Sequence, residues 1–336
     1  MEGEKTVAHD VPSGALPQRP ATYRLYVLCL TWPFEEHRMR RSLRIIPVCL
    51  LSVTSTLSAQ RPIKVFISVD MEGITGVVTD AQLGPDGFEY QRFREFMTLE
   101  ALAAIEGARE AGATQFVVAD SHGNMQNLLI ERFPQDVTII RGGNRPLSMM
   151  HGIDSTFSAA MFIGYHSATT NTQGVRAHTM SSATFAGVFL NGRPMAESSM
   201  NAALAGAAGV PVVMVSGDES AVGEVRTLLG DVEGAVVKQS IGFHSAATMT
   251  PAAGQALIKA RARAAIARLR DFKPHRVPGP YQLDLVYKSY LPAEIMALLP
   301  GIERRDSHTI RYSAQNLRDI SRFLVFSTAY RSDLTP

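Results

Sequence analysis

Through most of this 336-residue chain, short runs rich in β-branched and aromatic residues alternate with segments of helical periodicity. In the clearest unit, apolar residues recur at helical spacing over residues 91–111, between predicted strands at 64–69 and 115–119. Strands separated by a helix are typical of βαβ units, whose parallel strands form a sheet covered by helices on both faces. The chain is therefore predicted to be an α/β protein with a mostly parallel sheet sandwiched by helices.

The rest of the chain extends this pattern and then departs from it. Further strands are predicted at residues 137–141, 160–165, 210–215 and 235–238. The strand-like run at 185–190 is followed by Asn191-Gly192, which favours a tight hairpin turn and predicts a local antiparallel insertion. The pattern changes after Pro251, where the sequence predicts a basic helical segment, a strand at 281–287 and a final helix near 316–327. We expect an α/β domain over 60–250 and a smaller C-terminal α+β part over 251–336.

The first 59 residues differ from the remainder. Residues 1–38 are Pro-rich and patternless, and we interpret them as an extension from a start site placed too early, with Met39 the true start. Residues 39–59 have a cationic beginning, an apolar run and a small residue before Gln60, which is typical of a secretory signal peptide. A membrane anchor is the alternative, but the run is shorter than the roughly 20 apolar residues that a spanning helix needs. Export to the periplasm or the exterior is predicted, with no stable membrane span in the mature chain.

The composition limits which partners, disulfides and metal ligands are possible. Both cysteines, Cys29 and Cys49, precede residue 60, so the predicted mature chain has no disulfide and no thiolate ligand. Residues 60–336 carry equal numbers of basic and acidic side chains, and this balance argues against a nucleic-acid partner. Any metal site in the mature chain must be built from His, Asp and Glu.

Acidic and imidazole side chains follow several predicted strands. These residues are Asp70 and Glu72 after the first strand, His122 after the second, His166 after the strand at 160–165, and Glu197 after the hairpin. Each alone could be a helix cap or a loop residue. Because ligands collect at the carboxyl ends of parallel strands, the five together predict a site for a pair of divalent cations, with Zn²⁺ the first candidate. Nearby cations would turn the repulsion between Asp70 and Glu72 into attraction.

His178 lies 12 residues after His166 in a loop rich in Gly, Thr and Ser. A loop histidine near a metal pair is a candidate acid–base or substrate-orienting group, and an exposed histidine is the alternative. Asp218 is expected to cap a helix. The phosphate-binding loop, dinucleotide fingerprint, nucleophile elbow and His-Glu-x-x-His motifs are all missing from the sequence.

Six blocks in order, SVDMEGITG, DSHGNM, FIGYHS, GVRAHTMSS, NGRPMAE and VSGDES, resemble the zinc D-aminopeptidases of the DppA type. The resemblance covers roughly residues 64 to 330. It implies two zinc ions per subunit held by Asp70, Glu72, His122, His166 and Glu197. It also implies that His178 is catalytic. The resemblance further implies a ring-shaped homo-oligomer, which is a decamer in the prototype of the family.

The function predicted on these grounds is a dinuclear zinc aminopeptidase acting on short peptides, with an N-terminal D-residue such as D-Ala. One alternative is a metal-dependent phosphoesterase or amidase on the same ligands, for which Arg176 would supply the phosphate contact. The other is a non-catalytic periplasmic peptide-binding protein with a structural metal. If Asp70 bridges both ions, each ion has three protein ligands and an open position, which favours an enzyme.

Overall fold

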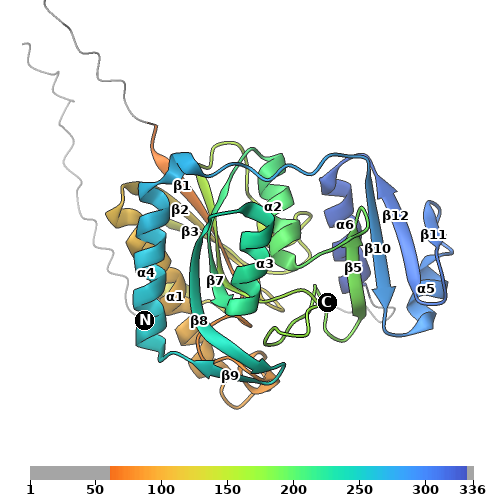
Figure 1. The fold of residues 1–336 in the computed structure, drawn as a ribbon, viewed down its shortest axis with the longest axis horizontal. Coiled ribbons are helices and arrows are strands. Elements are labelled where there is room, and N and C mark those ends of the chain that lie inside the picture. The colour runs from red at the N-terminus through yellow and green to blue at the C-terminus, as the bar shows by residue number, and fades with distance from the viewer. Residues whose placement is uncertain (1–60, 331–336) are drawn as a thin grey trace, which may run out of the picture. The chain divides into compact units, whose positions relative to one another are not determined.

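The computed structural model describes residues 61–330 of the chain (Figure 1). The predicted extension at 1–38 and the predicted signal peptide at 39–59 lie outside the described residues. Within residues 61–330, no helix combines the length and the apolar character needed to cross a membrane. The described residues all belong to one compact unit.

The larger sheet has seven strands in the order β3-β2-β1-β4-β7-β8-β9. Its strands are β1 (Ile63–Val69), β2 (Ala113–Asp120), β3 (Val137–Ile140), β4 (Ala159–Tyr165), β7 (Val212–Asp218), β8 (Glu233–Gly242) and β9 (Ser245–Thr248). All neighbouring strands run parallel except β9, which pairs antiparallel with β8. The predicted α/β fold with a mostly parallel sheet is confirmed, and β9 is the strand that the sequence pattern did not indicate.

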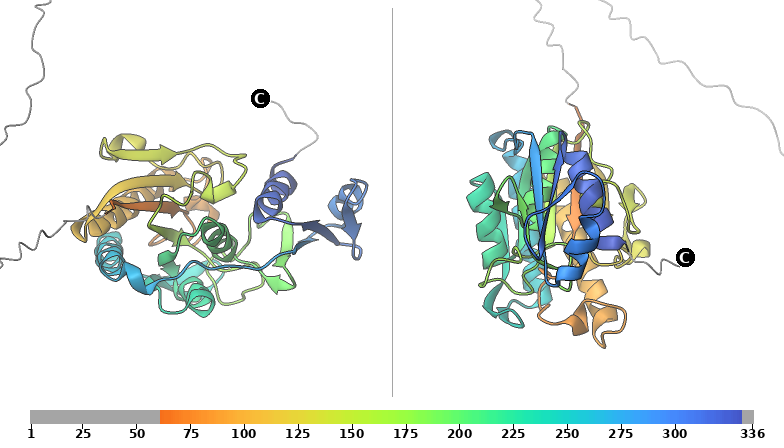
Figure 2. Two further views of the ribbon diagram at one scale, coloured as in Figure 1. Left: turned by 90° about the horizontal axis from the view of Figure 1, so that it is seen from above. Right: turned by 90° about the vertical axis from the view of Figure 1, so that its right-hand side faces the viewer.

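Helices cover both faces of this sheet (Figures 1 and 2). They are α1 (Tyr90–Glu110), α4 (Pro251–Ala267), α2 (Glu197–Ala207) and α3 (Glu219–Leu229). Alternate side chains of each strand point to opposite faces. Val65 and Ile67 of β1 pack with α1 and α4, whereas Phe66 packs into the cluster that contains α2 and α3. The uninterrupted apolar runs in the sequence therefore reflect strands buried on both faces.

The second sheet is antiparallel and has five strands in the order β11-β12-β10-β5-β6. Its strands are β5 (Phe185–Leu190), β6 (Arg193–Pro194), β10 (Tyr281–Tyr287), β11 (Ile302–Arg304) and β12 (Thr309–Ala314). Two helices accompany it, α5 (Tyr290–Met296) and α6 (Leu317–Ala329). Four short 3-10 helices lie in connections, at Asp80–Gln82, Ile130–Arg132, Ser148–Met150 and Leu269–Asp271.

The two sheets do not divide the chain at residue 250 as predicted. The hairpin β5–β6 comes from the middle of the chain, yet β5 pairs with β10 and belongs to the second sheet. Helix α4 lies after residue 250 but packs on α1 against the first sheet. The difference has a physical reason, because an exposed two-stranded hairpin is only marginally stable, and pairing with β10 extends it to a full sheet.

One apolar cluster joins the two sheets. It combines Val188 of β5 and Leu285 of β10 with Met200 of α2 and Leu324 of α6. Helix α6 is thereby held beside the short 3-10 helix Ser148–Met150, which lies near the carboxyl edge of the first sheet. The second sheet thus contributes α6 as a wall at the edge where the predicted ligands lie.

Candidate metal centre

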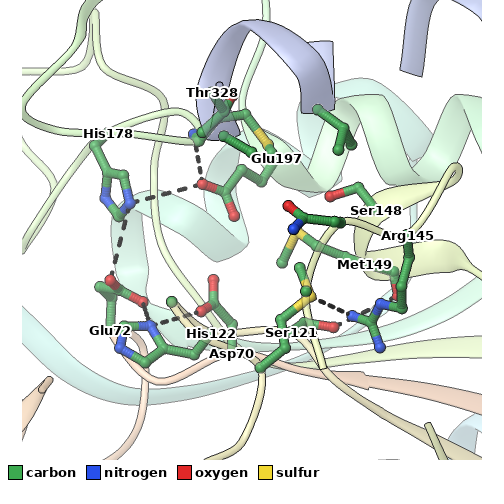
Figure 3. Close-up of a pocket in the computed structure, with 17 residues that line it drawn as sticks. Asp70, Glu72, Ser121, His122, Arg145, Ser148, Met149, His178, Glu197 and Thr328 are labelled. Carbon is green, nitrogen blue, oxygen red and sulfur yellow. Dashed lines mark hydrogen bonds and ion pairs between the residues drawn. The ribbon is translucent and has the colours of Figure 1, made fainter. Parts of the chain in front are cut away.

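The five predicted ligands meet at the carboxyl edge of the first sheet, and all five are buried (Figure 3 labels four of them). Asp70 lies between two groups. Its Oδ1 is 3.4 Å from Nδ1 of His122, and its Oδ2 is 3.3 Å from Nε2 of His166. Oε2 of Glu72 lies 2.9 Å from Nδ1 of His122, and Oε1 of Glu197 lies 3.5 Å from Nε2 of His166. Two carboxylate–imidazole groups therefore share the Asp70 carboxylate.

Two glycines explain how the Asp-x-Glu-Gly turn can approach β4 so closely. A Cβ on Gly73 would lie 2.0 Å from the carbonyl oxygen of Tyr165, and one on Gly164 would lie 2.3 Å from that of Asp70. Gly164 also adopts φ +72°, which side chains disfavour. The Gly73 N–H donates to the Gly164 carbonyl at 2.7 Å. The close approach places Asp70 beside the imidazole that follows β4.

A buried lysine holds the same turn from the other side. The Nζ of Lys238, on β8, donates to the main-chain carbonyls of Glu72, Ile74 and Val77, the last two at 3.1 and 2.7 Å. Burial lowers the pKa of Lys238 to about 8. Because these carbonyls belong to the segment that carries Glu72, Lys238 fixes the backbone on which two of the acids stand. Nothing in the sequence around Lys238 indicated this role.

Hydrogen bonds to main-chain carbonyls orient all three imidazoles. Nε2 of His122 lies 2.7 Å from the oxygen of Leu83, and Nδ1 of His166 lies 3.0 Å from that of Ser167. Nδ1 of His178 lies 2.9 Å from the oxygen of Arg176. A carbonyl can only accept, so the bonded nitrogen of each ring carries the proton. The other nitrogen faces the carboxylates with a lone pair for a metal, which is the usual arrangement of metal-binding histidines.

The electrostatics of the cluster show that it needs positive charge. Burial raises the pKa of Asp70, and the Glu72 carboxylate raises it further. Burial would raise the pKa of Glu72 also, but the charge of His122 outweighs it and holds that pKa well below its usual range. Burial opposes protonation of His166, yet Glu197 keeps the pKa of this imidazole well above its ordinary value. Divalent cations would compensate the same carboxylates while displacing the imidazole protons.

The donor set fits zinc. Within residues 61–330, ligand atoms lie within 4.8 Å of one another in three groups, namely Asp70/Glu72/His122, Asp70/His166/Glu197 and Glu72/His166/His178. The first two correspond to the predicted pair of sites that share Asp70. Oδ2 of Asp70 is fully buried and, apart from its 3.3 Å approach to Nε2 of His166, has no hydrogen-bond partner among the described residues, as expected of an atom available to a metal. Imidazole and carboxylate are ligands that Zn²⁺ accepts.

His178 lies over both groups. Its Nε2 is 3.8 Å from Oε1 of Glu72 and 3.7 Å from Oε1 of Glu197, and its ring stacks on that of His166 with centroids 4.0 Å apart. The side chain lines the pocket above the carboxylates (Figure 3). The alternative of an isolated, exposed loop histidine is therefore wrong. His178 can act either on a substrate or as a ligand through the third group.

The pocket above the ligands has a volume of about 190 Å³. Six non-glycine residues of the described chain have a positive φ, and four of them line this pocket, namely Met125, Asn144, Ser148 and Met180. Strained backbone of this kind concentrates at ligand sites, where surrounding structure must hold it in place. The side opposite His178 includes Arg145 and Ser148, and α6 contributes Val325 and Ala329. None of the residues in this second wall was indicated by the sequence.

Other polar residues singled out in the sequence have structural partners. Asp218 caps α3 by accepting from the Ala221 N–H at 2.7 Å, as predicted. Arg176 forms an ion pair with Asp80 and lies over the ring of Phe243. Since Arg176 is held there rather than lining the pocket, it does not provide the phosphate contact that the phosphoesterase alternative needs.

A buried chain of hydrogen bonds supports the floor of the site. Ser121 Oγ lies 2.7 Å from Ser68 Oγ, and the hydroxyl of Tyr165 donates to Ser68 at 2.7 Å. The amide of Asn201 on α2 donates to the Tyr165 hydroxyl at 2.8 Å. The main-chain N–H of Met180 donates to Oε1 of Glu197 at 2.7 Å. The ligand-bearing strand ends are thus tied to one another and to α2.

Comparison with known proteins agrees with this geometry. The profile of the D-aminopeptidase family M55 matches residues 63–326. The D-aminopeptidase of Bacillus subtilis (strain 168) is 35% identical over 269 residues, which cover 79% of this chain and 96% of that protein. A solved structure described as the Zn-dependent D-aminopeptidase DppA from Bacillus subtilis, a self-compartmentalizing protease, superposes with a TM-score of 0.76 at 33% identity. That alignment covers 81% of this chain and 100% of the other.

Proposed function

From the premise that this chain belongs to the D-aminopeptidase family and is a peptide-bond hydrolase, we propose that it is a dinuclear zinc aminopeptidase. Its substrates are short peptides with an N-terminal D-residue of the D-Ala type. The observation that carries the proposal is the sharing of the buried Asp70 carboxylate by two groups of ligands. Glu72 and His122 complete one zinc site, and His166 and Glu197 complete the other.

The residues of the chain hold and orient the groups that the reaction needs. Bound zinc supplies polarisation of the scissile carbonyl and a coordinated water whose pKa is lowered toward neutrality. Each site would have three protein ligands, which would leave a position open to substrate or water and supports catalysis over a structural role. The carbonyl partners of the imidazoles keep the ligand nitrogens aimed at the site.

His178 is the proposed catalytic residue. Its Nδ1–H is committed to the Arg176 carbonyl, so Nε2 is the atom that faces the pocket. A group at this position can hold or move a proton of the reacting amide, or stabilise the developing oxyanion. The loop conformation that fixes His178 is held by its main-chain N–H, which donates to the Ser167 carbonyl at 3.1 Å.

The size of the pocket supports small substrates. Its volume of about 190 Å³ is below the roughly 300 Å³ at which drug-sized ligand pockets begin. Two aliphatic side chains of α6 close one side, which suits a small apolar side chain such as that of alanine. The preference for D-residues rests on the family and on the relatives that carry this activity in their names.

Assembly into a homo-oligomer, possibly a decamer, is part of the proposal. The solved relative is described as self-compartmentalizing. In this chain α5 and the turn after it expose Tyr290, Leu291, Ile295 and Leu298 together, and an exposed apolar patch of this kind suits contact with a second copy. Sedimentation of residues 60–336 is expected to show an oligomer, and a monomer at all accessible concentrations would contradict it.

Export is also proposed, on the sequence of residues 39–59. Amino-terminal sequencing of the protein from its native host is expected to begin near Gln60. Recovery of intact residues 1–38 from the cytosol would contradict both the export and the proposed start at Met39.

The central experiment combines metal analysis with turnover. Elemental analysis of purified protein is expected to give about two zinc ions per chain, the number that two sites sharing Asp70 would hold. D-Ala-D-Ala and L-Ala-L-Ala are then compared as substrates at equal concentration, with p-nitrophenyl phosphate testing the phosphoesterase alternative. Hydrolysis of the phosphate ester with no hydrolysis of either dipeptide would reject the proposal, and equal rates on both dipeptides would reject the D-preference.

A further inference from the structure

A buried arginine without a charged partner stands in the second wall of the pocket. Arg145 is only 7% exposed. Its Nη2 donates to the Asp120 main-chain oxygen at 2.7 Å and lies 2.8 Å from the sulfur of Met125, and its Nη1 donates to the Ile140 carbonyl at 3.3 Å. No ion pair with a carboxylate is found for it within residues 61–330. A buried guanidinium with only neutral partners is costly, and an anion beside it would be strongly stabilised.

The carboxylate of Asp120, the residue whose main-chain oxygen Arg145 contacts, is already occupied. Oδ2 of Asp120 accepts from the N–H groups of Asn127 and Leu128 at 2.5 and 2.7 Å, and Oδ1 accepts from the Asn127 amide at 2.8 Å. These bonds hold the Asp120 carboxylate in the loop after β2. The positive charge of Arg145 is therefore left for something that enters the pocket.

Two polar atoms of this wall have no hydrogen-bond partner among the described residues. They are Nε of Arg145 and Oγ of Ser148, and both are buried. Buried donors are normally paired, so two unpaired donors three residues apart in one pocket wall indicate a missing acceptor. Ser148 also has φ +47° and Asn144 has φ +59°, which shows that the surrounding structure holds this loop in a costly conformation.

The arrangement of charge across the pocket specifies the acceptor. Figure 3 shows Arg145 and Ser148 on the side away from Glu72 and His178. The ligand side carries three carboxylates and takes the scissile carbonyl and the amino end of a peptide. The other side offers a guanidinium and a hydroxyl, and a guanidinium pairs with a carboxylate through two parallel hydrogen bonds.

We propose that Arg145, assisted by Ser148, binds the C-terminal carboxylate of the peptide substrate. The inference rests on the proposed peptidase function and adds a substrate-binding residue to it. Successive Cα atoms are only about 3.8 Å apart, so the carboxylate of a dipeptide lies one residue beyond the scissile carbonyl.

The first test varies the substrate and leaves the zinc-loaded enzyme intact. D-Ala-D-Ala is compared with D-Ala-D-alaninamide, which is the same dipeptide without the negative charge. The expected result is a kcat/KM higher for the free acid by about 10- to 100-fold, the range for a charged hydrogen bond made in a buried site. Equal kcat/KM values for the two compounds would overturn the inference.

The second test varies the residue. Arg145→Gln is expected to lower kcat/KM for D-Ala-D-Ala by about 10- to 100-fold while changing the value for the amide by less than about threefold. Arg145→Lys keeps the charge without the forked geometry and should retain part of the preference. Arg141→Gln, an exposed arginine of the same loop, is the matched control and should leave both values unchanged.

The ratio of the kcat/KM values for the free acid and the amide distinguishes binding of the carboxylate from structural support alone. If Arg145→Gln lowers both kcat/KM values equally, Arg145 supports the fold or the oxyanion and the inference is wrong. If zinc-loaded wild type hydrolyses neither compound, the proposed peptidase function fails. Calorimetric titration with the same two compounds then still tests whether Arg145 binds the carboxylate. Equal Kd values would then reject the carboxylate site, and tighter binding of the acid that disappears in Arg145→Gln would support it.

Discussion

The two sheets are joined by one apolar cluster but differ in how fully they are buried. In β4 and β7 of the first sheet every residue is buried, whereas β10 of the second sheet buries three of its seven residues and β12 buries only Ile310. The first sheet is parallel and carries helices on both faces, and the second is antiparallel with one face partly open. The difference shows which sheet can hold charges out of water.

The charged groups follow this difference in burial. Around the first sheet, Glu100 and Lys238 are fully or almost fully buried, as are the carboxylates at the strand ends. In the second sheet the pair Arg311–Asp284 keeps 22% and 15% of its side chains exposed. Charges at the first sheet are therefore expected to have large effects on function and stability, and those of the second sheet small ones.

The largest effect is expected from Asp70→Ala. Each ligand group loses the carboxylate that it shares with the other, so both zinc ions should be lost and kcat/KM should fall by at least about 10³-fold. Zinc content by elemental analysis and rates on D-Ala-D-Ala provide the measurement. Asp86→Ala, an exposed acid in the loop before α1, serves as the control and should keep zinc and activity. An Asp70→Ala protein that retains two zinc ions would contradict the shared role.

The next effect concerns pH and the acid Glu100 on α1. Burial raises its pKa from 4.5 to about 7. A hydrogen bond from the Thr75 N–H and the charge of Lys238 lower the pKa but do not outweigh burial. Between these pH values the folded state keeps a proton that the unfolded state has released. The stabilisation is therefore present below about pH 4.5 and is lost as the pH rises towards 7, by about 3 kcal/mol in total.

Glu100→Gln isolates this contribution because the amide does not titrate. The difference in unfolding free energy between wild type and Glu100→Gln, measured by denaturant at fixed zinc concentration, should decline across that window. A difference that stays constant from pH 4.5 to pH 7.5 would show that Glu100 does not titrate as its burial requires.

The third prediction concerns His178, on the loop that links the two sheets. His178→Ala should keep about two zinc ions per chain while kcat falls by about 10²-fold, equivalent to about 2.7 kcal/mol, because a proton-transfer or oxyanion group is lost. His308→Ala, at the residue just before β12 of the second sheet, should change neither quantity. Loss of zinc from His178→Ala would instead make His178 a ligand through its group with Glu72 and His166.

The smallest effect is expected in the second sheet. Arg311 and Asp284 form two hydrogen bonds of 2.6 and 2.7 Å across β10 and β12. Because the pair is partly exposed, Arg311→Gln should cost about 1 kcal/mol of unfolding free energy and leave zinc content unchanged. A double-mutant cycle with Asp284→Asn measures the coupling. A coupling above about 3 kcal/mol would remove the contrast between the sheets.

Most of the first sheet could be predicted because its signals are local. Continuous apolar runs such as residues 64–69, separated by a helix with 3.6-residue periodicity, specify buried parallel strands without reference to the rest of the chain. The ligand positions follow from the same pattern, since the carboxyl ends of parallel strands lie at one edge. Asp70, His122 and His166 could therefore be expected near one another before any coordinates.

The second wall could not be predicted in this way. Arg145 lies in a loop with no periodic pattern, and Lys238 occupies a position in β8 that a solvent-facing lysine could equally fill. Their roles depend on contacts with residues far away in the chain, such as the carbonyl of Glu72. No local preference encodes such contacts.

The sequence by itself determined the kinds of elements, their order, and the chemistry available at the strand ends, because hydrophobic periodicity and side-chain type are properties of short segments. Only the tertiary structure decided that β5 joins β10 across the boundary expected at residue 250, and that α6 and Arg145 close the pocket. These choices are made by long-range burial, in which distant segments compete to cover the same apolar surface. Their outcome depends on packing over the whole molecule.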